Sequence, residues 1–277
     1  MSERSRDRKA YALAREYLLQ LDNRVTEDVL ARYLTPPERP GTLAGVYRHL
    51  LESAKNRQMV GGVVDKALGN NGTQALSGLL GRFNPRKVVK RYGEDWEALH
   101  SDIQKMVRRR GKTLGKSKVI WPLFCRSITS GAAFLSQFAS ASDFHRWVGS
   151  FKSDDRSREA LPLLLKWKID GFGFPLACNF LKEMGYFNFG KPDVHIKDIF
   201  MGLNLVESRD DDVIFKAITR IARNQNVTPY NADKLFWLVG SGLFYNHRRL
   251  GKNGWIRTDK AKFIRTARRK LRLSSGG

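Results

Sequence analysis

The chain has 277 residues, of which 50 are Lys or Arg and 27 are Asp or Glu, so its formal net charge is +23. Hydrophobic residues make up 42% of the sequence, enough for a sizeable core, and this excludes a largely disordered chain. The excess of positive charge argues against an acidic-surface enzyme of small-molecule metabolism and favours a polyanionic partner.

The N-terminal half predicts helices and one strongly basic stretch. Apolar residues recur at helical spacing over residues 11–21 and again over 43–51. Residues 86–118 then contain eleven Lys or Arg against four acidic residues. Such a run fits a solvated helix face, and it equally fits a surface that neutralises phosphates.

The C-terminal half continues the helical pattern. A third apolar stripe covers residues 213–221, and residues 233–242 are typical of a buried helix. Residues 248–272 carry eleven Lys or Arg against the single acid Asp259, and their interleaved apolar residues predict a docked helix. Because no segment alternates apolar and polar residues for long, the sequence predicts an all-α fold.

The chain has only two cysteines, Cys125 and Cys178, and we expect both to be ordinary buried thiols. Two cysteines cannot hold an all-cysteine zinc site or a four-thiolate iron–sulfur cluster, and a reducing compartment is the default expectation. The charged N-terminus lacks a signal-peptide pattern, and the longest uncharged run, inside 126–143, is too short and polar to span a membrane. We therefore expect a soluble, cytoplasmic, monomeric protein without a membrane partner.

A glycine pair separates two apolar helical segments in the middle of the chain. Gly171 and Gly173 lie between segments 161–167 and 176–184, where glycines permit a tight turn and close approach of a ligand. Pro175 is acceptable in the first turn of the second helix, and the exposed amides of a helix start favour a phosphate oxygen. From the residues alone, the segment also fits an ordinary helix–turn–helix corner.

Asp193 follows, directly before another apolar segment. Local sequence predicts that it caps a helix beginning at Val194. A carboxylate at a helix start is also a candidate for stabilising positive charge in a reaction. These two roles are compatible.

Together, residues 169–175 and the motif Asp193-Val194-His195 resemble the helix-hairpin-helix DNA glycosylase superfamily, called HhH-GPD. The family hairpin typically reads Leu-Pro-Gly-Val-Gly-Xaa-Lys, and residues 169–175 align with it without a gap. Asp193 then falls at the spacing of the family's catalytic aspartate. The resemblance covers roughly 40 residues of the 277.

The resemblance implies two helical lobes with a DNA groove and a base pocket between them. The hairpin backbone at Gly171, Phe172 and Gly173 would grip a phosphate of double-stranded DNA, with Lys166 and Lys168 beside it. Asp193 would stabilise the positive charge that develops on the sugar as the base leaves. His195 would have a structural role.

Pro175 stands where bifunctional family members have a lysine nucleophile, so the resemblance implies a monofunctional enzyme that leaves an abasic site and an intact strand. No cofactor is expected, although related hairpins commonly hold a monovalent cation through backbone carbonyls. No metal is needed for the chemistry.

Residues 50–60 are similar to the family segment that inserts a polar side chain into the duplex, which makes Asn56, Arg57 and Gln58 candidates for DNA contact. An ordinary helix end with polar surface residues fits them as well. Six aromatic residues are expected mainly in the core, with one or two able to stack on an extruded base; they are Trp167, Phe172, Phe174, Phe187, Phe189 and Trp237.

These expectations divide the chain into an N-terminal helical lobe (1–115), a catalytic lobe (116–247) and a basic C-terminal segment (248–277). The expected activity is a DNA N-glycosylase. Its substrate is either an oxidised or alkylated base in repair or, as we favour, a hypermodified phage cytosine such as α-glucosyl-hydroxymethylcytosine in anti-phage defence. The alternatives are a non-catalytic DNA-binding module and, from charge alone, an RNA-binding protein, for which no recognition motif is present.

Overall fold

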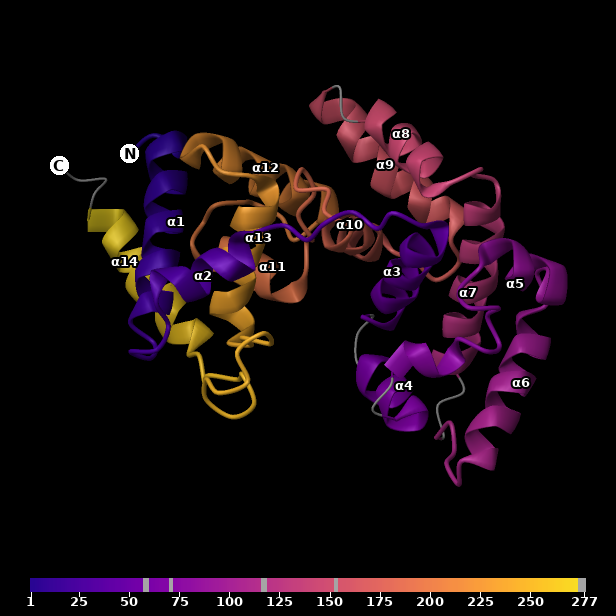
Figure 1. Ribbon diagram of the computed structural model, residues 1–277. Helices are drawn as coiled ribbons and strands as arrows, with labels where there is room; N and C mark the ends of the chain where they lie inside the picture. Colours follow the sequence, from indigo (N-terminus) through magenta and orange to yellow (C-terminus); the bar gives the residue numbers. More distant parts are fainter. Residues whose placement is uncertain (57–59, 70–71, 116–118, 152–153, 274–277) are drawn as a thin grey trace. The chain divides into compact units, whose positions relative to one another are not determined.

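The computed structural model describes residues 1–56, 60–69, 72–115, 119–151 and 154–273 (Figure 1). Throughout these ranges the regular structure is helical and no β-strand occurs, which confirms the predicted all-α class. Two isolated β-bridges, Leu243 to Trp255 and Lys252 to Trp255, close one loop.

The chain forms two compact units, one of residues 1–37 with 185–277 and the other of residues 38–184. We call them unit 1 and unit 2. These boundaries differ from the division expected at 115/116 and 247/248. The physical reason is that the N-terminal helix packs against helices from the last third of the chain.

Unit 1 is organised around a central helix, α13, which packs against α1, α2, α11 and α12, while α14 packs against α1 and α11 (Figure 1). Its core is strongly aromatic, as in the edge-to-face pair of Phe200 and Phe236, whose ring centroids are 5.0 Å apart. The helices of unit 1 are α1 (Glu3–Leu19), α2 (Glu27–Leu34), α11 (Val194–Gly202), α12 (Asp211–Gln225), α13 (Pro229–Ser241) and α14 (Lys260–Leu273).

A buried ion pair fastens α1 to α12 within unit 1. The Asp7 side chain is fully buried and accepts hydrogen bonds from Arg220 Nε at 2.9 Å and Nη2 at 3.1 Å. Asn224 Nδ2 donates a third bond to this carboxylate at 2.7 Å. Since every contact comes from α12, the pair explains why the N-terminal helix belongs to this unit.

Unit 2 is organised around α7, which packs against α3, α5 and α6. Close packing is possible where α7 has Gly131, because a Cβ there would lie 2.8 Å from Leu50 Cδ2 of α3. The helices of unit 2 are α3 (Leu43–Lys55), α4 (Val60–Leu68), the 3-10 helix η1 (Gly72–Leu76), α5 (Pro85–Tyr92), α6 (Trp96–Arg109), α7 (Ile120–Ser136), α8 (Ala141–Ser150), α9 (Asp155–Lys168) and α10 (Phe174–Glu183).

The three apolar stripes of the sequence lie in α1, α3 and α12, as predicted. The second basic run ends in α14, which buries Phe263, Ala267 and Leu271 in the core of unit 1. The expectation of a docked helix is therefore confirmed. Gly202 of α11 leaves room for this helix, since a Cβ there would lie 2.5 Å from Ile264 Cγ2.

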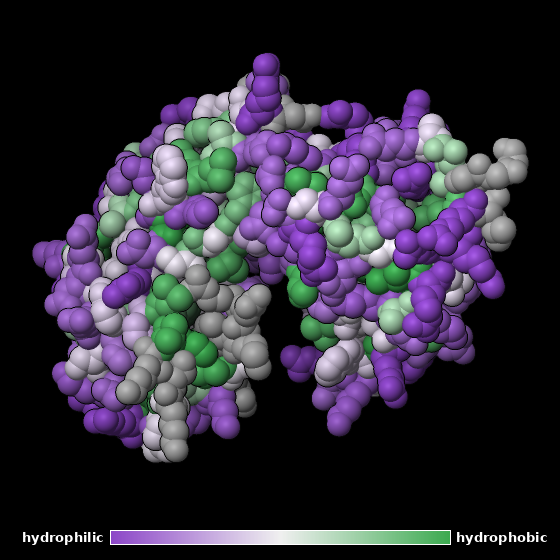
Figure 2. Space-filling model, turned by 180° about the vertical axis from the view of Figure 1, so that it is seen from behind, coloured by the Kyte–Doolittle hydropathy of each residue, from purple (hydrophilic) through white to green (hydrophobic). Residues whose placement is uncertain are grey.

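No helix in the described part of the chain is long and apolar enough to cross a membrane. The face seen in Figure 2 is mainly hydrophilic, and hydrophobic residues show on it in several small areas.

Candidate functional site

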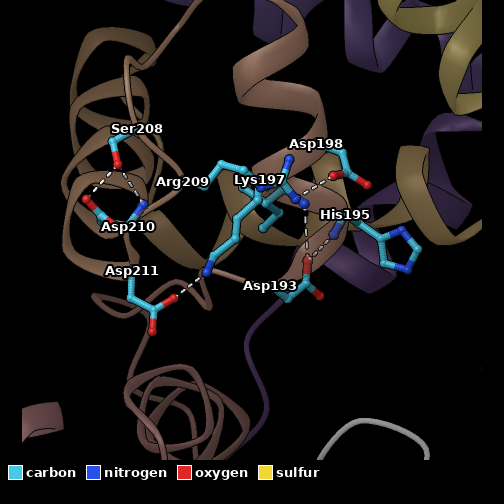
Figure 3. Close-up of polar contacts among 9 residues, drawn as sticks. Asp193, His195, Lys197, Asp198, Ser208, Arg209, Asp210 and Asp211 are labelled. Atoms are coloured by element: carbon cyan, nitrogen blue, oxygen red, sulfur yellow. Dashed lines mark hydrogen bonds and ion pairs between the residues drawn. The ribbon is translucent and has the colours of Figure 1, made fainter.

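Asp193 is the N-cap of α11, as its sequence predicts (Figure 3). Its backbone is extended, with φ −89° and ψ 174°, and its Oδ1 accepts hydrogen bonds from the backbone N–H of His195 at 2.9 Å and of Ile196 at 3.2 Å. No donor among the described residues binds its other oxygen, Oδ2. The half-buried carboxylate is thus fixed by one oxygen and can offer the other to a ligand.

Ion pairs hold α11 behind this carboxylate. Asp198 pairs with Lys260 at the start of α14 and with Arg209 at 2.7 Å, and Lys197 pairs with Asp211 at 2.5 Å. Figure 3 shows these side chains around the first turns of the helix. Charge pairs with three other segments therefore restrain the helix that positions Asp193.

His195 packs the start of α11 against α13. A Cβ added at Gly240 would lie 2.5 Å from His195 Cβ, so the close approach requires glycine there. Nδ1 of His195 is buried without a hydrogen-bond partner. Burial lowers the pKa of His195 below its usual 6.5, and the neighbouring Lys260 and Lys191 act in the same direction, whereas Asp193 and Asp198 oppose them. The imidazole is thus favoured in its neutral form.

The segment leading to Asp193 is also anchored on α13. The backbone N–H of Lys191 donates to the carboxylate of Asp233, which is almost fully buried, at 2.5 Å. Asp233, Trp237 and Gly240 follow at intervals of four and three residues, so they share one face of α13. Two members of that face contact Lys191 and His195, which places the half-buried Trp237 on the side of α13 that faces the Asp193 segment.

The predicted glycine turn lies in unit 2, between α9 and α10. Gly171 has φ +78°, and a Cβ there would meet Ser127 Oγ at 2.8 Å and Leu123 Cδ1 at 2.9 Å. Ser127 Oγ also donates to the carbonyl of Asp170 at 2.6 Å, while the N–H of Asp170 donates to Ser130 Oγ at 2.9 Å. The turn is therefore clamped onto α7 from both sides.

Gly173 is the N-cap of α10, and its backbone N–H donates to no acceptor within the described ranges. A Cβ at this position would contact only Pro175 Cδ, at 3.6 Å, so the amide lies in open space. Pro175 occupies the first turn of the helix, as predicted, where it removes no helical hydrogen bond. Phe172, between the glycines, is buried, so only its backbone is available to a ligand.

The last turn of α9 exposes Lys166 and Lys168. Trp167 between them is 82% exposed and Phe187 of unit 1 is 40% exposed, so the expectation that these two aromatics are core residues is wrong. Helical spacing alone does not say which face of α9 is covered. Phe172, Phe174 and Phe189 are buried as expected.

Asn56 is the C-cap of α3 and is exposed. Arg57 and Gln58, the other candidates for insertion into the duplex, lie outside the described residues. Nothing in the described structure distinguishes Asn56 from an ordinary helix end.

No group of His, Cys, Asp or Glu in the described part of the chain has the arrangement of a metal site. In the hairpin, the carbonyls of Ile169, Asp170 and Gly173 already accept hydrogen bonds from within unit 2, and a monovalent cation would have to share them. Both cysteines are buried, and burial raises the pKa of the Cys125 thiol well above its usual value.

Sequence reasoning did not find the supports of Asp193. The contact of His195 with Gly240 and the pairing of Asp198 with Lys260 join helices that are distant in sequence. Their only sequence signal is weak: a glycine inside the apolar segment 233–242 suggests close approach of another chain segment.

Comparison with protein-family models, with curated proteins and with solved structures finds no match to this chain.

Proposed function

We propose that the protein is a monofunctional DNA N-glycosylase and that Asp193 is its catalytic carboxylate. The observation that carries the proposal is the state of Asp193: Oδ1 is fixed by two backbone N–H groups, and Oδ2 has no donor among the described residues. A pre-oriented carboxylate with one open oxygen is what the cleavage of an N-glycosidic bond requires.

The chemistry follows from charge. As the bond between the base and C1′ breaks, positive charge develops on the sugar, and a fixed carboxylate beside it stabilises that charge without reorganising. The same carboxylate can orient the attacking water and accept its proton. The products are the free base and an abasic site in an intact strand.

The glycine turn of unit 2 supports DNA as the substrate. The open N–H of Gly173 at a helix start suits a phosphate oxygen, and the exposed Lys166 and Lys168 add positive charge in the preceding turn. These contacts carry no sequence information, so they would hold the backbone rather than select a base.

The absence of a lysine at position 175 supports the monofunctional assignment, because proline has no amine for a Schiff base. We expect no covalent adduct when the wild-type protein and its substrate DNA are treated with borohydride. A trapped protein–DNA adduct would show that another lysine supplies lyase activity.

For the substrate we propose a hypermodified phage cytosine, such as α-glucosyl-hydroxymethylcytosine, which places the protein in anti-phage defence. This rests on the family resemblance. The competing substrate class is an oxidised or alkylated base in repair. Activity confined to 8-oxoguanine or an alkylated purine would overturn our choice.

The open amide and exposed lysines of the hairpin would equally serve a non-catalytic DNA-binding protein. Asp193→Asn separates the two functions, because Asn also caps helices well but carries no charge. We expect this variant to bind DNA and to form abasic sites at least about 100-fold more slowly, as scored with an aldehyde-reactive probe on unmodified, oxidised, alkylated and glucosylated DNA.

The matched control is Asp154→Asn. Asp154 caps α9 through the same two types of backbone bond, to Arg156 N at 2.7 Å and Ser157 N at 2.9 Å. This variant should keep full activity. Unchanged function in Asp193→Asn, with no abasic sites on any DNA, would leave Asp193 as a cap and favour the binding module.

A further inference from the structure

One loop of unit 1 is built with unusual precision around an exposed aromatic residue. Residues 243–258 connect α13 to α14, and Trp255 within them is 63% exposed. Its indole Nε1 donates to the carbonyl of Ser241 at 2.9 Å, and its backbone forms bridges to Leu243 and Lys252. The ring is thus held in one orientation while much of its surface faces solvent.

Glycines make this arrangement possible. Gly242, Gly251 and Gly254 have φ of +64°, +50° and +86°, and a Cβ at any of them would lie within 2.5 Å of a carbonyl oxygen of the loop. Phe244, Leu250 and Ile256 fix the loop on the core. An exposed Trp on a rigid support loses little conformational entropy when a flat ligand stacks on it.

The charge around Trp255 indicates the ligand. Residues 243–258 include four exposed cations and no acidic residue; the cations are Arg248, Arg249, Lys252 and Arg257. Among the described residues none of the four forms an ion pair. A stacking surface surrounded by unpaired cations is the combination that binds unpaired nucleotides, since the ring contacts the base and the cations contact phosphates.

The loop is rooted beside the candidate catalytic carboxylate. At its start, Gly240 and Ser241 contact His195 and Trp255 respectively, and at its end Lys260 pairs with Asp198 of α11. Both ends therefore adjoin the helix that Asp193 caps. A nucleotide bound on this loop would lie on the same surface of unit 1 as Asp193.

We propose that the loop 243–258 binds unpaired DNA nucleotides, with Trp255 stacking on a base and Lys252 and its neighbouring cations contacting phosphates. This inference rests on the proposed function, because a glycosylase must hold a base that has left the helical stack. It adds the element that recognises the unpaired state.

The test uses the full chain and unmodified oligonucleotides of one sequence: a single strand, a paired duplex, and a duplex with one bulged 2-aminopurine. Trp255→Ala should weaken binding to the single strand and the bulged duplex about 10-fold or more, while binding to the paired duplex changes by less than about 2-fold. The 2-aminopurine emission should be quenched by the wild type and restored in the variant.

Trp255→Phe should retain most of the affinity, and Trp167→Ala, at the most exposed large hydrophobic residue of the described chain, is the control. Lys252→Gln leaves the loop backbone intact, and it should reduce the salt dependence of single-strand binding by about one phosphate contact. This second variant keeps the test valid if Trp255→Ala unfolds.

Equal loss of affinity for paired and unpaired DNA, no loss in either variant, or preference for RNA of the same sequence would overturn this proposal. The outcome is separable from that of the proposed function. Abasic sites formed with Trp255→Ala fully active would overturn only the loop's role. Trp255-dependent binding without abasic sites on any DNA would overturn only the glycosylase.

Discussion

Asp193 and Asp154 hold the same position at a helix start but differ in their second oxygen. Oδ2 of Asp154 accepts a hydrogen bond from its own helix, from Ser157 Oγ at 3.2 Å. Oδ2 of Asp193 has no such donor in the described chain. The capping role can be predicted from sequence for both residues, whereas the open oxygen depends on which side chains surround the helix start.

The buried imidazole of His195 predicts a pH dependence of stability. Burial lowers the pKa of His195 below 6.5, so the unfolded chain binds this proton more readily than the folded protein. The stability that the neutral imidazole provides is therefore complete above pH 6.5 and is lost as the pH falls through the lower pKa of the folded state.

We expect the urea midpoint of the wild type to fall between pH 6.5 and 5, and that of His195→Gln to fall less steeply. His49 of unit 2, whose pKa burial also lowers, contributes a remaining slope in both proteins. An identical pH slope in wild type and variant would show that His195 is not held neutral by the fold.

At the scale of the elements, the hairpin separates a structural glycine from a functional one. Gly171→Ala should destabilise unit 2 by about 1–3 kcal/mol, because alanine is strained at positive φ and its Cβ would meet Ser127 and Leu123. Gly173→Ala should cost less than about 1 kcal/mol, since φ is −95° and the space is open.

The two variants should differ in DNA binding relative to stability. A methyl group at Gly173 would shield the amide at the start of α10, so this variant should lose DNA affinity while it keeps the melting temperature of the wild type. Filter binding and thermal unfolding measure the two effects. Unchanged affinity in Gly173→Ala would remove the hairpin amide from the DNA contacts.

The same scale shows where sequence patterns are sufficient. Residues 43–51 predict α3 because Val46, Tyr47, Leu50 and Leu51 repeat at helical spacing and are all buried. In α9, Leu163 and Trp167 share the same spacing, yet both are exposed. Periodicity identifies the helix, but only the packed structure says whether a stripe is covered.

At the scale of the molecule, the composition of unit 1 follows from one buried ion pair. The sequence did not predict that residues 1–37 join residues 185–277, because Asp7 and Arg220 are 213 positions apart and carry no motif. The two basic runs, in contrast, indicate a polyanionic partner wherever they lie, since charge acts without regard to local structure.

Removal of this ion pair should destabilise unit 1. Asp7→Ala leaves Arg220 without its buried partner and should cost about 3–5 kcal/mol in the free energy of unfolding. Glu3→Ala removes the other carboxylate on Arg220, 3.1 Å away but 68% exposed, and should cost less than about 1 kcal/mol. Denaturant unfolding checks both, and equal effects would contradict this account.

The central claim is that the protein releases a base from DNA through Asp193. The most direct measurement is mass spectrometry of the small molecules set free from DNA containing glucosylated hydroxymethylcytosine. We predict that the wild type and Asp154→Asn release the intact modified base, that Asp193→Asn releases none above background, and that all three bind the DNA. Release of no base from this or any other DNA by the wild type, with tight binding retained, would contradict the claim.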